Sequence, residues 1–219
     1  MLGRVMSLGY PDKHPEAIAA ATRMIELGTW HIGDAYYWRA WNRYNLQELE
    51  TAWADIEDAI KLLVNSGVYT LAGFIAFARK ELDTAILRFE RAYAIDRTNC
   101  EAVWTGPMVH VEQQAWAPAA PKFVTAVGCF SSAATEARAD IERTNAATYA
   151  ETIKTRRIAA AQERVEAAEH RRAQAAFNAA QGFVRLGQKA EALVQVEAAA
   201  HPLMREKAAS LKASIEKMP

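Results

Sequence analysis

LETAWADIEDAIKL, at residues 49–62, returns 33 positions later as LDTAILRFERAYAI, at residues 82–95. Both segments lie within residues 35–97, where one pattern of apolar residues is written twice. The shared positions are Leu49, Ala52, Ile56, Ala59 and Leu62 in the first segment and Leu82, Ala85, Phe89, Ala92 and Ile95 in the second. Self-similarity at a period in the low thirties is typical of a stacked array of structural repeats.

Each copy of the pattern predicts a hairpin of two helices. The apolar residues fall three and four positions apart, which places them on one face of an α-helix, and a short polar break separates two such runs. Small residues, Ala40 or Gly73 in the first helix and Ala52 or Ala85 in the second, stand where the two backbones must approach. Because one hairpin cannot bury its apolar face alone, stacking on neighbouring hairpins completes the core.

This pattern resembles the tetratricopeptide repeat, a family with small residues at its eighth, twentieth and twenty-seventh positions and a large apolar residue at the twenty-fourth. The matching residues are Ala40, Ala52, Ile56 and Ala59 in a first copy, Gly73, Ala85, Phe89 and Ala92 in a second, Val103, Ala119, Phe123 and Ala126 in a degenerate third, and Ala180, Phe183, Leu186, Gly187, Ala192, Val196, Ala199 and Pro202 in a fourth. The alternative is a generic alanine-rich bundle with accidental spacing.

The resemblance implies an all-α fold, a right-handed α-α superhelix of helical hairpins with a long charged helical insertion. We expect an N-terminal half-repeat or cap helix in residues 1–28, with its helix from Pro15 to Leu27, and three repeats in residues 29–130. A long helical insertion, or cryptic repeat, follows in residues 131–172. The last repeat and a capping helix complete the chain in residues 173–219.

Two stretches depart from a regular array. Gly106-Pro107 predicts a kink or a break in the first helix of the third copy, because proline removes a backbone donor and clashes with the preceding turn. From Ser131 to Gln181 there is neither Gly nor Pro, and Ala, Glu and Arg predominate. We expect one helix over residues 131–146 and a long one over residues 149–186, and both an elongated hairpin and a single projecting arm fit that length.

Composition narrows the classes of partner. Lys plus Arg number 26 and Asp plus Glu also number 26, so the chain has no excess of positive charge that would predict binding to nucleic acid. The sequence has no run of 18 apolar residues, so we expect no membrane span. Residues 1–9 are too brief for a secretory signal, and whether an export signal has been removed stays open.

No constellation of residues predicts chemistry. The sequence has no glycine-rich phosphate loop, no His-Glu-x-x-His and no Gly-x-Ser-x-Gly. Glu163, Glu166 and His170 share one helix face, but a metal site needs ligands that converge from more than one element. We therefore expect no catalytic residue, no metal and no cofactor, and a protein that is not an enzyme.

Aromatic residues provide the candidate partner-binding site. In the family that the chain resembles, set positions of each first helix line a concave groove that receives peptides. The corresponding residues are Asp34, Tyr37, Trp41, Tyr44, Asn45, Thr70, Phe74, Phe77, Trp104 and Met108. They lack the Lys, Asn and Arg set of the family's chaperone-tail binders, and aromatic side chains favour an apolar or proline-containing segment.

The function that we predict is a non-enzymatic scaffold that binds a peptide or partner protein in this groove. A second hypothesis is an oligomerisation or assembly module that pairs through the long helix at residues 149–186, so a homo-oligomer stays open. The groove itself is either open to a ligand or covered by the chain's own N-terminal segment, by the long helix or by another subunit.

The two cysteines are a candidate disulfide. Cys100 begins the first helix of the third copy and Cys129 lies near the end of its second helix, and in an antiparallel hairpin these points share one end. The alternative is a pair of buried free thiols. A bridge would imply an oxidising, periplasmic compartment, and free thiols a cytoplasmic one.

The bridge between Cys100 and Cys129 is tested by mass spectrometry of the alkylated native protein with and without reductant. A bridge leaves no thiol to alkylate until reductant is added, and closing the loop stabilises the fold by roughly 3–4 kcal/mol in the chain-entropy model. Two alkylated thiols in the unreduced protein would rule it out.

Overall fold

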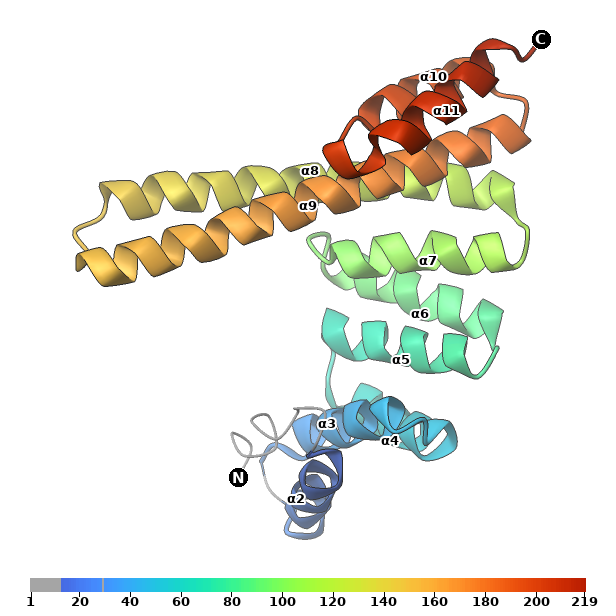
Figure 1. The fold of residues 1–219 in the computed structure, drawn as a ribbon. Helices are drawn as coiled ribbons and strands as arrows, with labels where there is room; N and C mark the ends of the chain where they lie inside the picture. Colours follow the sequence, from blue (N-terminus) through green and yellow to red (C-terminus); the bar gives the residue numbers. More distant parts are fainter. Residues whose placement is uncertain (1–12, 29) are drawn as a thin grey trace. The chain divides into compact units, whose positions relative to one another are not determined.

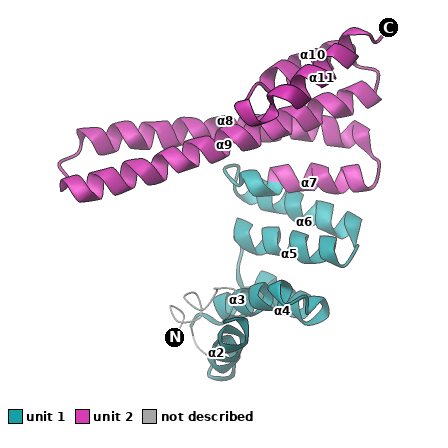
Figure 2. Cartoon of the chain, viewed as in Figure 1, with its two compact units in different colours: residues 1–102 teal, residues 103–219 magenta. Residues whose placement is uncertain are grey.

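The computed structural model describes residues 13–28 and 30–219 as helices joined by short connections, without a strand in those ranges. Residues 1–12, part of the predicted half-repeat, lie outside the described residues. The chain divides into two compact units, residues 1–102 and residues 103–219, which Figure 2 colours separately. The predicted all-α class is confirmed.

The first unit is built from antiparallel helical hairpins. Its helices are α2 (His14–Glu26), α3 (Ile32–Asn45), α4 (Leu49–Leu62), α5 (Ser66–Ala78), α6 (Leu82–Ile95) and the first turn of α7 (Cys100–Glu112). The helix α3 packs on α4 and α5 on α6, as the repeat predicts, while α2 packs on α3 and α4 on α5 (Figure 1). The predicted N-terminal helix is therefore α2.

The small residues of the repeat are where the helices touch. Ala40, Ala52 and Ala59 have no exposed surface, and neither does Ile56. In the next hairpin a Cβ atom on Gly73 would lie 2.7 Å from a ring carbon of Phe89. The absence of that atom lets the Phe89 ring lie against the backbone of α5.

Four helix ends share one turn, in which a residue of positive φ closes the helix. The residue is Gln47 (φ 62°), Lys80 (φ 64°), Gln114 (φ 59°) or Gly187 (φ 71°). In the first of these turns the Gln47 amide donates to the Tyr44 carbonyl and the next amide donates to the Arg43 carbonyl, and the other three repeat this pair of bonds. The pair is a Schellman motif, which satisfies carbonyls that the helix end would leave open.

Buried charge joins the first three helices. The Asp55 side chain of α4 is 4% exposed, and its two oxygens accept hydrogen bonds from Arg39 at 2.7 and 2.9 Å and from Arg43 at 2.7 Å. Arg39 also donates to the Thr22 hydroxyl of α2 at 3.1 Å. Removing Asp55 would take away the carboxylate that the half-buried guanidinium groups of Arg39 and Arg43 share, so this cluster holds α2, α3 and α4 in one arrangement.

A second polar cluster ties α5 to the segment that follows α6. The Asn99 side chain accepts from the Ala102 amide, at the start of α7, and its amide nitrogen donates to the hydroxyls of Ser66 and Thr70. Ser66 in turn donates to the carbonyl of Ala92 at 2.9 Å. Each of these buried groups has a partner, which is what a packed interior requires.

The second unit is organised by two long helices. It contains most of α7, then α8 (Trp116–Ala146), α9 (Glu151–Arg185), α10 (Lys189–Ala198), a 3₁₀ turn at Pro202–Met204 and α11 (Arg205–Glu216). The helices α8 and α9 pack as one elongated hairpin (Figure 1). The predicted insertion at residues 131–172 therefore begins inside α8 and ends inside α9, while its domain boundaries stay predictions.

The structure corrects one expectation about the helices of this unit and narrows another. Residues 131–146 are not a separate helix, because α8 runs unbroken from Trp116 past Pro121 and Gly128 to Ala146. Of the kink or break expected at Pro107, the break is excluded, because α7 continues through this residue. Proline removes one backbone hydrogen bond and clashes with the preceding turn, yet the helix stays continuous at this residue.

Small residues and exposed ion pairs join α8 to α9. Ala134 and Ala137 of α8 and Ala161 and Ala168 of α9 are buried. Toward the loop that joins the helices, Arg164 pairs with Asp140 and Arg138 with Glu169. The hydrogen bonds from these arginines lower the pKa values of both carboxyl groups.

The apolar residues of the predicted fourth copy pack together, while the bounds of the copy stay a prediction. The end of α9 packs on α10, where Ala180, Ala192, Val196 and Ala199 are buried, and α11 adds Ala208 and Ile215 to the same cluster. A Cβ atom on Gly182 would lie 2.8 Å from the Cβ of Ala120. The close approach of α8 and α9 at this point therefore also depends on a residue without a side chain.

The contact between Gly73 and Phe89 predicts the effect of exchanging one copy's residue pair for another's. Gly73→Ala should lower the free energy of unfolding, because overpacking costs about 1–3 kcal/mol and the better helix propensity of alanine returns about 1 kcal/mol. Adding Phe89→Ile, which recreates the pair Ala40 and Ile56 of the first hairpin, should recover part of the loss. Denaturant unfolding of the two single variants and the double variant measures the coupling, and strictly additive losses would contradict it.

Candidate partner-binding site

Five aromatic side chains on two helices of the first unit make up the candidate site. Tyr37, Trp41 and Tyr44 come from α3, and Phe74 and Phe77 from α5, the first helices of their hairpins. All five are half-buried. We call this set the aromatic face.

The rings of the aromatic face rest on the core of their unit. Tyr37, Trp41 and Tyr44 pack against the buried cluster that includes Ala40 and Leu71. Ring centroids are 6.5 Å apart for Tyr44 and Phe74 and 5.3 Å apart for Phe74 and Phe89, the second pair meeting edge to face. Side chains fixed in this way lose little conformational entropy when a ligand covers them.

Burial changes the ionisation of two tyrosines on the face. It raises the pKa values of Tyr37 and Tyr44, because removal from water disfavours the phenolate. Both side chains therefore stay neutral at physiological pH and offer a ligand an apolar ring with a hydroxyl group.

The polar residues of the predicted groove already have partners within the unit. The Asn45 amide donates to the Trp41 carbonyl at 2.7 Å, and the Thr70 hydroxyl donates to the Ser66 carbonyl at 2.9 Å. Asp34 lies 3.2 Å from the ring nitrogen Nδ1 of His31. The rings, rather than these donors, are what the face offers to a ligand.

The two remaining groove residues lie in the second unit, each in its own surroundings. The Trp104 ring packs against Phe123 and Phe130, with centroids 5.7 and 6.4 Å away, and the Arg171 guanidinium stands 5.6 Å over it. Met108 is 38% exposed, and the Asn178 amide nitrogen lies 3.5 Å from its sulfur. A partner-binding role for both residues stays a prediction.

Of the three residues on one helix face that were considered as metal ligands, the histidine contacts another histidine. His170 stacks on His201 with centroids 5.4 Å apart, while Glu163 and Glu166 are exposed. Within residues 13–28 and 30–219 no three His, Cys, Asp or Glu side chains converge as metal ligands would.

Two features are relevant to the compartment of the protein: the state of its cysteines, and whether a helix could cross a bilayer. Cys100 and Cys129 are buried, and the described part of the chain contains no free cysteine. None of the described helices combines the length and the apolar character that crossing a bilayer requires. The compartment itself stays a prediction.

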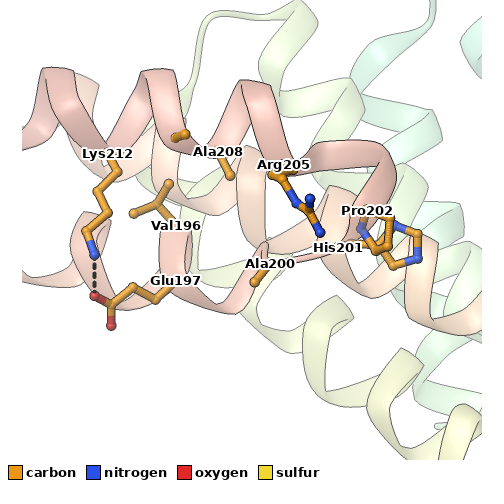
Figure 3. Close-up of a pocket in the computed structure, with 9 residues that line it drawn as sticks. Val196, Glu197, Ala200, His201, Pro202, Arg205, Ala208 and Lys212 are labelled. Carbon is orange, nitrogen blue, oxygen red and sulfur yellow. Dashed lines mark hydrogen bonds and ion pairs between the residues drawn. The ribbon is translucent and has the colours of Figure 1, made fainter.

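The structure contains a cavity that the sequence analysis did not predict. It has a volume of about 470 Å³ and lies between α10 and α11 (Figure 3). Its lining residues are Val196, Glu197, Ala200, His201, Pro202, Arg205, Ala208, Ala209 and Lys212. On each helix the lining residues follow the helical period, but the sequence alone does not show that the two faces meet, because two helices and the turn between them contribute the lining.

The raised pKa values of Tyr37 and Tyr44 predict the alkaline behaviour of the fold. Tyrosine absorbance at 295 nm should show a component that ionises above the usual pKa of about 10, and Tyr37→Phe plus Tyr44→Phe should remove it. The stability that these neutral phenols contribute is complete below the unfolded-state pKa and is lost as the pH rises through the folded-state pKa. Urea-unfolded protein is the control, and a native titration that coincides with it would contradict the burial.

Comparison with known proteins supports the fold. No family model and no curated protein matches the sequence. Among solved structures, the chain is similar to YrrB, described as a TPR protein with an unusual peptide-binding site (TM-score 0.62, 15% identity, 99% of this chain and 90% of that one). It is also similar to MamA, with a TM-score of 0.61 and 12% identity over 93% of this chain and 92% of that one. A third similar structure is TTC0263, a thermophilic TPR protein of Thermus thermophilus, with a TM-score of 0.52 and 13% identity over 96% of this chain and 98% of that one. With these neighbours, the repeated hairpins and the repeated turn, the chain has the tetratricopeptide-repeat fold.

Proposed function

We propose that the protein is a non-enzymatic scaffold that binds a peptide or partner protein on the aromatic face. The observation that carries the proposal is that the half-buried Tyr37, Trp41, Tyr44, Phe74 and Phe77 lie on the first helices of two successive hairpins, the first three packed against the core of the unit. Tyrosine and tryptophan are the residues on which binding energy concentrates at protein interfaces.

The chemistry of the face favours an apolar ligand segment. Its amide and hydroxyl donors, on Asn45 and Thr70, are engaged within the unit, so a ligand gains mainly by covering rings. The Lys80 ammonium stands 5.7 Å over the Phe77 ring. A segment with proline or aliphatic side chains would bury the rings without leaving its own charges unpaired.

The fold neighbours add support of a general kind. YrrB is described as a TPR protein with a peptide-binding site, so a chain of this fold can present such a site. At 15% identity the likeness concerns the fold, and the peptide chosen by this chain depends on its own side chains.

The alternative, assembly through the long helix, has less support. Some alanines of α9, such as Ala161 and Ala168, are buried, and α9 packs along α8. The exposed residues of α9 are mostly Arg, Glu and Gln, together with Ala159, Ala160, Ala167 and Ile153. Charged surfaces of both signs are usually solvated.

The proposal is tested by removing rings from the face. A library of displayed proline-containing and aliphatic peptides selects a ligand, and fluorescence anisotropy measures its affinity for the full chain. Trp41→Ala and Phe74→Ala should each weaken binding by about 2 kcal/mol, or roughly thirtyfold, because the lost ring contacts lie at the centre of the face. Thermal unfolding followed by circular dichroism confirms that each variant is folded.

Trp53→Ala is the matched control, since Trp53 is a half-buried tryptophan of the neighbouring helix α4 that packs under Arg79 and Arg88. It should leave the affinity unchanged. Equal losses in Trp53→Ala and Trp41→Ala, or full affinity in a folded Trp41→Ala and Phe74→Ala double variant, would exclude the aromatic face as the binding site.

A further inference from the structure

The cavity between α10 and α11 has features of a ligand site that the proposed function does not use. Its volume of about 470 Å³ falls within the roughly 300–1,000 Å³ of small-molecule pockets. Figure 3 shows its two ends. Arg205 and His201 lie at one, and Lys212 and Glu197 lie at the other, with Val196, Ala200 and Ala208 between them.

Among the charged residues that line the cavity, the exposed Arg205 is the one without a partner in the described part of the chain. It makes no hydrogen bond or ion pair with the described residues, whereas Lys212, at the far end, is paired with Glu197 at 3.0 Å. Arg205 is also the first residue of α11, where the helix dipole disfavours a cation. Helix stability therefore gives no reason for an arginine at this position.

His201 lies beside Arg205, and one of its ring nitrogens can donate a hydrogen bond to a ligand. Its ring nitrogen Nδ1 accepts a hydrogen bond from the Leu203 amide at 3.2 Å, so the neutral imidazole carries its proton on Nε2. The stacked ring of His170, 5.4 Å away, fixes the plane of the imidazole. This end of the cavity thus contains a guanidinium and an imidazole N–H and no carboxylate of its own.

The wall between the two ends is made of small apolar side chains. Ala200, Ala208 and Ala209 occupy little space, and the lining residue Val196 is 3% exposed. An aliphatic group of a few carbons that lies against such a wall is stabilised in proportion to the apolar surface that it removes from water. A phosphate has no such group and needs more than one unpaired cation.

We propose that this cavity binds an aliphatic carboxylate, with the carboxylate on Arg205 and His201 and the alkyl chain along Ala200 and Ala208. The guanidinium offers the carboxylate a forked pair of N–H donors, which makes this contact the strongest in the site. Either a free small acid or a peptide end with an aliphatic last residue carries this chemistry.

The test is a titration of the full chain with N-acetyl-leucine, followed by the backbone amide signals of Ala200, Arg205 and Ala208 in NMR spectra. A ligand of this size should bind with a dissociation constant on the order of 1–10 mM. N-acetyl-leucinamide, which has the same alkyl group and no charge, should bind at least about tenfold more weakly. Inorganic phosphate should move these signals no more than chloride at equal ionic strength.

Two variants locate the site. Arg205→Gln should weaken N-acetyl-leucine binding about tenfold, while Lys207→Gln, an exposed cation on the same helix that does not line the cavity, should not. Ala209→Leu should block binding by filling the cavity from an exposed position. A peptide ending in leucine distinguishes the two sources, since it binds as well as the small acid only if the cavity accepts a chain end.

Three results would overturn the proposal. The first is equal affinity for the acid and the amide. The second is unchanged affinity in a folded Arg205→Gln or Ala209→Leu variant. The third is a set of shifted signals that lies outside α10 and α11, or no shifts at about 20 mM ligand, well above the affinity expected for this size.

Discussion

The close approach of paired helices at residues with little or no side chain is the constraint on which the structure depends. Gly73 leaves the space that the Phe89 ring occupies, and Gly182 does the same for α8 against α9. Interiors of this density admit no extra methylene without displacement. A small residue on one helix of a hairpin is matched by a larger side chain on the other helix, and the hairpins share this pairing although their sequences differ.

Helix ends are controlled by backbone geometry more than by composition. The turn between paired helices places its closing residue at positive φ whether that residue is Gly187, Gln47 or Lys80. For the non-glycine residues this conformation costs free energy, and the two Schellman hydrogen bonds offset it. The repeat therefore tolerates a change of residue at the turn while keeping the angle between its helices.

Polar groups serve two different purposes in the chain. Asp55 is buried and accepts hydrogen bonds from the half-buried Arg39 and Arg43, so these charged groups position helices. Arg205 has no such partner among the described residues and stands in a cavity with apolar walls. The same distinction separates Asn45 and Thr70, whose donors are engaged, from the aromatic rings beside them, which present surface without unmet hydrogen bonds. Ligand chemistry is therefore inferred from the groups left unused after folding.

The sequence alone determined the helical hairpins, their small contact residues, the fourth copy and the aromatic positions of α3 and α5, because periodicity along a helix directly encodes which face is buried. Tertiary structure alone decided that α8 runs unbroken from Trp116 to Ala146, that α7 passes through Pro107, and that Arg205 and His201 share a cavity. A local pattern cannot report these features. They depend on which side chains from separate helices meet in space, and on whether packing offsets a local penalty such as that of proline.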